Sequence, residues 1–332
     1  MSKNRTALKK LFELAVILRS AELAKEEGGE QEALEVLKDA ATMLPKSALV
    51  AYDLGVLYSA SGENAEAIKA YRKAIKLKPD FPEALNNLGL ALAAIGKDKQ
   101  AIKEFNRALA KKSDHTTALY NLGNALLNRR FQKDTQSEQA INEAIDKYQS
   151  AVTINPENPV FLYALARAYY LKGEFVKAEY GKAIQNFQKA LGVKKQLEMK
   201  PDDEPKDASI FRYVGFAYYT MKEINPAISN LQKAIKLEPG DMDTYYYLGN
   251  AYFENSDYGQ AIDSYEKARQ LKSGNVELLI SLGLAYYNSE QFKKAVEVFK
   301  EASTSKPDDS ELVKYLDQAR KQLDEEQKKA DG

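Results

Sequence analysis

The sequence predicts an all-α protein built as a linear array of repeated helical hairpins. A short pattern with a central glycine recurs through the chain, and most of its copies lie 34 residues apart. The glycines of this pattern are Gly55, Gly89, Gly123, Gly215, Gly249 and Gly283. Alanine, leucine, lysine and glutamate dominate the 332 residues, whereas 17 glycines and 10 prolines are few for this length, as is typical of a helical chain.

Each glycine is followed by a second pattern, which predicts the second helix of a hairpin. In five of the six copies an alanine comes 12 residues after the glycine, an aromatic residue or leucine four residues later, and another alanine three residues further on, as in Ala67, Tyr71 and Ala74; after Gly123 the same pattern comes later, at Ala144, Tyr148 and Ala151. Positions three or four residues apart share one face of a helix. A polar turn such as SASGEN separates the two patterns. We therefore expect two helices that approach closely at the glycine and alanine positions, with a proline near the end of several units.

These residues resemble the tetratricopeptide repeat (TPR) family, whose 34-residue helix-turn-helix unit carries a Trp, Leu-Gly, Tyr, Ala, Phe, Pro pattern. The chain contains no tryptophan. The tryptophan place is filled by Leu85, Leu119, Phe211, Tyr245 and Leu279. The resemblance covers about residues 14–325 and implies a right-handed α-solenoid of about eight hairpins, closed by a C-terminal capping helix.

We expect the TPR array to occupy residues 1–309. Its units are predicted at about 14–47, 48–81, 82–115, 116–158, 159–203, 208–241, 242–275 and 276–309. The first unit is degenerate, and the fourth and fifth carry extra residues, near 130–139 and near 174–180 and 193–200. Residues 310–332 are predicted as a capping helix with a frayed tail, because Leu312, Leu316, Ala319 and Leu323 form one apolar stripe.

Composition argues against several classes of function. The 48 basic and 48 acidic residues balance, which gives no bulk field for nucleic acid. The chain has no cysteine and one histidine, so thiolate nucleophiles and multi-histidine metal sites are excluded. His115 lies at a unit junction, where we expect a local structural role, with the next helix capped by Thr116 or Asp114. We therefore predict no enzymatic activity, no cofactor, no metal and no nucleic-acid partner.

The N-terminus begins like a secretory signal, with Lys9 and Lys10 before an apolar run, but Glu13 interrupts the run and Arg19 ends it. We expect a cytoplasmic protein, with a periplasmic or secreted one as the less favoured alternative. No stretch is long and apolar enough to predict a membrane span.

The resemblance implies a concave groove, lined by the first helix of each unit, that receives a peptide or a partner helix. The candidate groove residues are Asn87, Tyr120, Asn121, Asn124, Tyr163, Arg167, Tyr170, Arg212, Tyr213, Tyr219, Tyr246, Tyr247, Asn250 and Tyr287. Asparagine can donate to and accept from a peptide backbone, whereas tyrosine and arginine are frequent binding hot spots. Fifteen of the 21 tyrosines lie between residues 163 and 287, which favours the C-terminal half. The alternative interpretation is that the tyrosines pack against the neighbouring unit and that Arg167 and Arg212 pair with nearby acids.

Two known recognition patterns of the resembled family are poorly matched. Tyr52, Asn86 and Tyr120 stand where a carboxylate-gripping lysine would be expected. An asparagine ladder is matched at Asn87 and Asn121 and replaced by Asp53 in the preceding unit, so we expect at most a short ladder.

The sequence thus predicts a non-catalytic scaffold or adaptor that binds a peptide or helix of a partner protein in its groove. Two alternatives remain open. The repeats could stack on copies of the same chain as a weak homo-oligomer, or the inserted edges of units four and five could carry the partner site.

Overall fold

The computed structural model describes residues 2–26, 28–129 and 137–330, with side chains for residues 10–26, 28–128 and 138–329. Within these ranges the chain forms 17 helices and no strand, so the all-α prediction is confirmed. The helices belong to two compact units, Met1–Glu157 and Asn158–Gly332, which are described one at a time. The extra residues expected at 130–136 and the tail at 331–332 lie outside the described residues.

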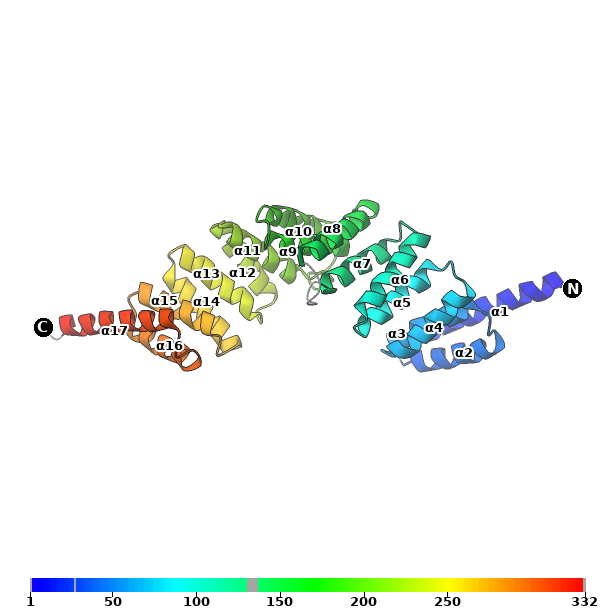
Figure 1. Cartoon of the computed structure of the whole chain (residues 1–332), viewed down its shortest axis with the longest axis horizontal. Helices are drawn as coiled ribbons and strands as arrows, with labels where there is room; N and C mark the ends of the chain where they lie inside the picture. The colour runs from blue at the N-terminus through cyan, green and yellow to red at the C-terminus, as the bar shows by residue number, and fades with distance from the viewer. Residues whose placement is uncertain (1, 27, 130–136, 331–332) are drawn as a thin grey trace. The chain divides into compact units, whose positions relative to one another are not determined.

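The N-terminal unit is a stack of four antiparallel hairpins (Figure 1). Its helices are α1 (Ser2–Leu23), α2 (Glu30–Met43), α3 (Ala48–Ala60), α4 (Asn64–Leu77), α5 (Pro82–Ala94), α6 (Asp98–Lys111), α7 (Thr116–Arg129) and α8 (Ser137–Ile154). Each odd-numbered helix packs against the even-numbered helix that follows it and contacts the odd-numbered helix of the next hairpin. Helices α1, α3, α5 and α7 therefore form one layer, and the second helices of the hairpins lie behind it.

The C-terminal unit continues the same pattern through four further hairpins and one last helix. Its helices are α9 (Pro159–Gly173), α10 (Glu179–Gln196), α11 (Asp207–Met221), α12 (Ile224–Leu237), α13 (Met242–Glu254), α14 (Tyr258–Leu271), α15 (Val276–Asn288), α16 (Phe292–Ser305) and α17 (Ser310–Ala330). Helices α9, α11, α13 and α15 form the first layer. Leu312, Leu316 and Ala319 of α17 are buried in the core around α15 and α16, so this helix covers the end of the stack.

The repeated glycine brings the two helices of a hairpin into contact. A Cβ atom placed on Gly55 would lie 2.5 Å from the ring of Tyr71, and one on Gly249 would lie 2.5 Å from the ring of Tyr265. The same relation joins Gly89 to Phe105, Gly123 to Tyr148 and Gly283 to Phe299. The glycine therefore leaves room for the aromatic ring of the second helix, which explains why the two residues recur together.

The junction before α7 differs from its prediction. The helix begins at Thr116, which makes His115 the N-cap residue, and the backbone N–H of Ala118 donates to Nδ1 of His115 over 3.4 Å. The sequence assigned this cap to Thr116 or Asp114. Burial lowers the pKa of His115, so the ring is neutral at physiological pH and Nδ1 is free to accept.

The extra residues of the fifth hairpin lie in two places. Residues 174–178 connect α9 to α10, and they include the exposed side chains of Phe175 and Val176. The second insertion lengthens α10 and continues as the connection 197–206 to α11. This connection folds around Lys194, whose side chain is 2% exposed. The Lys194 ammonium donates to the backbone carbonyls of Asp203 and Pro205, each over 2.7 Å.

Candidate functional site

All of the candidate groove residues lie on first-layer helices. Asn87 is on α5, and Tyr120, Asn121 and Asn124 are on α7, all in the N-terminal unit. The other candidates are on α9, α11, α13 and α15 of the C-terminal unit. Each unit therefore presents its own candidate surface, and the two are treated separately.

In the N-terminal unit, a chain of side-chain hydrogen bonds crosses three helices. The Asn87 amide donates to the Tyr52 hydroxyl (3.0 Å), the Asn86 amide donates to the Asn87 carbonyl oxygen (3.1 Å), and the Asn121 amide donates to the Asn86 carbonyl oxygen (2.9 Å). Asn86 and Asn121 are buried, whereas Asn87 is half-buried. This short ladder therefore holds α3, α5 and α7 together, and Asn121 lies beneath the surface. Asn86 links the two ladder residues but is not among the candidates. Its position next to Asn87 in the sequence was the signal that could have identified it.

Asn124 and Asn250 share a second arrangement. Each directly follows the glycine of its repeat, and each accepts a 2.7 Å hydrogen bond at Oδ1 from a tyrosine hydroxyl of the second helix, Tyr148 or Tyr265. Where the second helix carries Phe105 or Phe299 instead, the residue after the glycine is leucine. The phenol fixes the carboxamide oxygen, so the amide N–H groups are oriented as donors toward the remaining side of the residue.

The C-terminal unit carries a band of half-buried tyrosines. We define this tyrosine band as Tyr163, Tyr170, Tyr213, Tyr219, Tyr246 and Tyr247. Ring centroids lie 5.2 Å apart for Tyr170 and Tyr213, 5.6 Å for Tyr219 and Tyr247, and 5.8 Å for Tyr246 and Tyr247. Burial raises the pKa of Tyr163 and of Tyr219 to about 12, so these hydroxyls stay protonated at neutral pH and can donate hydrogen bonds. The rings pack against one another and against neighbouring hairpins, as the alternative interpretation expected, and they also keep part of their surface exposed; their role in partner binding stays a prediction.

Three candidates outside the tyrosine band have different surroundings. The exposed guanidinium of Arg167 lies 5.8 Å from the centroid of the Tyr163 ring and 5.9 Å from that of Tyr213. Tyr287 packs its ring against Phe292, with centroids 5.5 Å apart. In the N-terminal unit, Tyr120 packs in the same way against Tyr148 (6.0 Å).

Arg212 ties two hairpins together. Its Nη1 atom lies 2.5 Å from Oδ2 of Asp241, and Oδ1 of Asp241 caps α13 by accepting from the backbone N–H of Thr244 (2.7 Å). The arginine and its carboxylate partner are both about three-quarters buried, with 23% and 25% of their side chains exposed. This pairing is the alternative that the sequence left open for Arg212.

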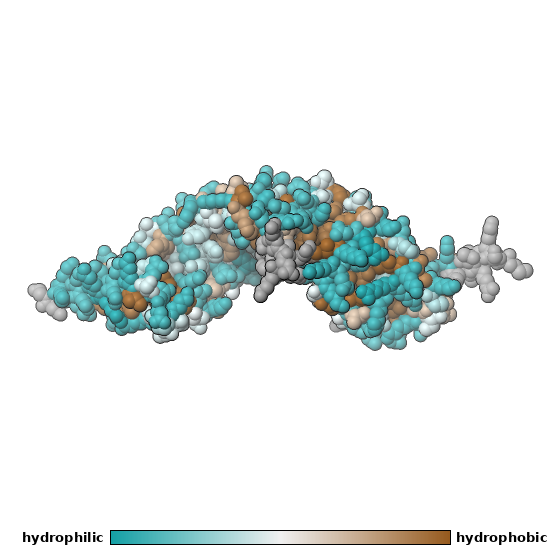
Figure 2. All heavy atoms as spheres, viewed as in Figure 1, coloured by the Kyte–Doolittle hydropathy of each residue, from teal (hydrophilic) through white to brown (hydrophobic). Residues whose placement is uncertain are grey.

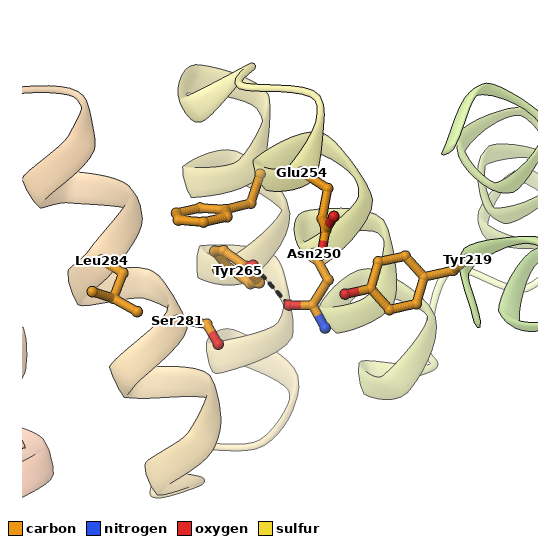
Figure 3. Close-up of a pocket in the computed structure, with 7 residues that line it drawn as sticks. Tyr219, Asn250, Glu254, Tyr265, Ser281 and Leu284 are labelled. Atoms are coloured by element: carbon orange, nitrogen blue, oxygen red, sulfur yellow. Dashed lines mark hydrogen bonds between the residues drawn. The ribbon is translucent and has the colours of Figure 1, made fainter. Parts of the chain in front are cut away.

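A pocket lies next to the tyrosine band, between α11, α13, α14 and α15. It has a volume of about 90 Å³ and is lined by Tyr219, Asn250, Phe253, Glu254, Tyr265, Ser281 and Leu284. Figure 3 shows Asn250 between Tyr265, which binds its carboxamide oxygen, and Tyr219, whose hydroxyl points toward it. Phe253 and Leu284 supply apolar walls, and the Glu254 carboxylate is paired with Lys222 at 2.6 Å. Two of the candidates, Tyr219 and Asn250, line this pocket.

Two further classes of site were searched for within the described part of the chain. No group of three or more His, Cys, Asp or Glu side chains there is placed to hold a metal ion. None of the described helices has the length and apolar character needed to cross a membrane.

Family models match the chain in several places. The TPR repeat model matches residues 55–96, 137–173 and 215–256, and two tetratricopeptide repeat models match residues 82–114 and 252–320. Together these segments span more than half of the chain. A search of curated protein sequences gives no match.

Solved structures show the same fold. The C-terminal part of a TPR repeat-containing protein from Cytophaga hutchinsonii is 21% identical with a TM-score of 0.59, over 80% of this chain and 99% of that one. A tetratricopeptide repeat protein from Parabacteroides merdae is 17% identical (TM-score 0.53), over 82% and 98%. A chain of the APC/C hetero-tetramer Cut9-Hcn1 is 22% identical (TM-score 0.55), over 81% of this chain but 48% of that one.

The stacked hairpins, the repeated glycine and aromatic pairs and these matches define an all-α solenoid of the protein-interaction scaffold class. The chain belongs to the tetratricopeptide repeat family.

Proposed function

We propose that the chain is a non-catalytic adaptor that binds an extended peptide segment of a partner protein on the first-layer face of its C-terminal unit. The observation that supports this most directly is the pocket beside the tyrosine band, in which the Asn250 amide is held as a donor by Tyr265. Apolar walls next to a few fixed polar groups are typical of binding sites.

The polar groups of the pocket favour an extended peptide over a helix. The Asn250 amide and the Tyr219 hydroxyl both donate, and they match the backbone carbonyls of an extended chain, which are free to accept. In a partner helix those carbonyls already accept from the helix itself. Phe253 and Leu284 would contact an apolar side chain of the same segment. The pocket volume of about 90 Å³ limits this contact to a single side chain.

The tyrosine band extends the contact surface beyond the pocket. Its rings are held by mutual contacts and by the core around Phe216 and Leu231, so little conformational freedom is lost when a partner covers them. At its other end, the Arg167 guanidinium offers a partner for a carboxylate of the peptide. The remaining first-layer candidates of this unit are Arg212, which pairs with Asp241, and Tyr287, which packs against Phe292.

The inserted edge of the fifth hairpin is a second candidate for the partner site. Phe175 and Val176, on the α9–α10 connection, are 51% and 41% exposed. Adjacent exposed apolar side chains often mark an interaction site. A site at this edge is compatible with an adaptor function, but the partner would contact a different surface.

Site-specific photo-cross-linking tests the proposal. A benzophenone side chain at Phe253, inside the pocket, is expected to cross-link a peptide of another protein in a cell extract, identified by mass spectrometry. The same group at the exposed Lys267 of α14 is the matched control and should give no such product. Leu284→Arg should fill the pocket and abolish the Phe253 product. Products with copies of the same chain would favour self-assembly, and products that appear only with the probe at Phe175 would favour the inserted edge.

A further inference from the structure

The first-layer face of the N-terminal unit exposes aliphatic side chains on two neighbouring helices. Leu49 and Val56 of α3 are 38% and 37% exposed, and Leu90 of α5 is 43% exposed. Helices α3 and α5 contact each other. Val56 and Leu90 hold equivalent places, each directly after the glycine of its repeat. Figure 2 shows hydrophobic surface, in brown, on the N-terminal unit.

A carboxylate without a partner lies on the same face. Asp53 comes four residues after Leu49 and three before Val56, so the three side chains share one face of α3. The Asp53 side chain is half-buried. Among the described side chains, none donates a hydrogen bond to its carboxylate and none forms an ion pair with it. Burial raises the pKa of Asp53 to about 6, which shows how little compensation the charge receives within the unit.

The repeat register explains why Asp53 lacks a partner. Asn87 and Asn121 hold the equivalent place in the next two hairpins, and each uses its amide N–H to bond a polar group on another residue of the network. An ionised aspartate has no N–H to donate and needs an incoming donor instead. None of the side chains described for this unit supplies one.

The charges of this face are of one sign. Helices α3 and α5, whose side chains are all described, contain no lysine or arginine. Their acidic residues are Asp53 and Glu83, and both charges act on the Tyr52 phenol, whose pKa is raised by burial and by these carboxylates among other groups. Basic residues are concentrated on the second helices of the same hairpins, for example Lys73 and Lys76 on α4. The part of this face formed by α3 and α5 is therefore apolar and negative, whereas basic residues lie on α1 of the same layer and on the second helices.

We propose that this face binds a segment of a partner protein in which a lysine or arginine is flanked by aliphatic residues. The cation pairs with the Asp53 carboxylate, and the aliphatic side chains cover Leu49 and Val56 on one side and Leu90 on the other. Pairing with a cation offsets the free energy that the carboxylate loses through partial burial. The apolar side chains around the pair exclude water from it. The site lies in the other unit from the pocket of the proposed function, so either can fail without the other.

Selection from a phage-displayed library of random 12-residue peptides against the full chain tests this proposal. The expected outcome is enrichment of peptides in which Lys or Arg stands beside aliphatic residues. A synthetic enriched peptide should bind Asp53→Asn about tenfold more weakly than the unchanged chain in calorimetry. Asp146→Asn, an exposed carboxylate on α8 of the same unit, is the matched control and should bind normally.

Two further measurements separate the explanations. Replacing the peptide lysine or arginine with glutamine should cause the same loss and no additional loss in Asp53→Asn, as expected for a direct pair. Binding should persist in Leu284→Arg, which alters only the C-terminal pocket. Enrichment of peptides without a basic residue, absence of any enrichment, or equal affinity for Asp53→Asn would overturn the proposal. Dimerisation of the chain that depends on Asp53 would also overturn it, because the occupant would be a second copy.

Discussion

The ammonium of Lys194 lies 2.6 Å from the Asp207 carboxylate inside the C-terminal unit, and this pair organises the connection between α10 and α11. The same ammonium donates to the carbonyls of Pro201, Asp203 and Pro205. A buried ammonium is costly unless its hydrogen-bonding capacity is met, and here one carboxylate and three carbonyls surround it. The long connection of the fifth hairpin is therefore tied to the body of α10.

Lys194→Met should release this connection. The substitution keeps the length of the side chain but removes the charge, so the carbonyls and Asp207 lose their shared donor. We expect the free energy of unfolding to fall by about 3 kcal/mol. Hydrogen exchange monitored by mass spectrometry should show faster exchange over residues 197–207. The exposed neighbour Lys195→Met is the control, and protection equal to that of the unchanged chain in Lys194→Met would contradict this interpretation.

Gly249→Ala should destabilise the C-terminal unit. The added methyl group would meet the Tyr265 ring at 2.5 Å, and the ring can retreat only by giving up its place against α13. We expect a loss of about 2 kcal/mol in the free energy of unfolding, measured by urea titration. Gly181→Ala, in helix α10 with nothing within 4 Å of the new methyl group, should instead be neutral or slightly stabilising.

Asp53→Asn should stabilise the chain at neutral pH and much less in acid. The pKa of Asp53 is raised from its ordinary value of 3.8 to about 6 in the folded chain, because burial disfavours the carboxylate. Its contribution to stability is thus fully present below about pH 4 and is lost as the pH rises through about 6. Since the side chain keeps contact with solvent, we expect a gain of about 1 kcal/mol at pH 7.5.

Thermal unfolding of Asp53→Asn and of the unchanged chain at pH 7.5 and pH 4.5 measures this difference. Asp146→Asn controls for the change in net charge and should behave alike at both pH values. A larger stabilisation at pH 4.5 than at pH 7.5 would show that the sign of the pKa shift is wrong.

The two arginines of the C-terminal unit should respond differently to substitution. Arg212→Gln breaks the contact with Asp241 and should lower the free energy of unfolding by about 1 kcal/mol. Arg167→Gln, on an exposed side chain, should change stability by less than about 0.5 kcal/mol, yet weaken the capture of the peptide cross-linked at Phe253. Equal stability losses in the two variants, measured by thermal unfolding, would contradict the distinction between them.

The hairpin fold could be predicted because close packing dictates its sequence. The space in front of each glycine is filled by the aromatic ring of the second helix, so a fixed period in glycine, alanine and aromatic residues reveals the stack. The burial of each candidate side chain could not be predicted in the same way. Asn87 and Asn121 occupy equivalent places, yet only Asn121 is fully buried. Register assigns a residue to a face, whereas burial depends on how its neighbours fill the space around it.

Other features lie in connections between helices, where no repeated sequence pattern predicts the conformation. Lys194 is one lysine among many in the sequence, and only the folded connection shows that it is enclosed. His115 is the N-cap residue because α7 begins at Thr116; Asp114 could be the N-cap only if the helix began at residue 115. In contrast, the pairing of Asn250 with Tyr265 and of Asn124 with Tyr148 has a signal in the sequence, because asparagine follows the glycine in two repeats whose second helix carries tyrosine.

That pairing constrains how a repeat of this kind can evolve. Changing Leu284 to asparagine alone would leave an amide without its phenol, and changing Phe299 to tyrosine alone would leave a phenol without its amide. The hairpin of α3 and α4 avoids the second problem with Ser59, whose hydroxyl lies 3.2 Å from that of Tyr71. New ligand preferences in this chain should therefore arise through paired substitutions within one hairpin, inherited or exchanged as a unit.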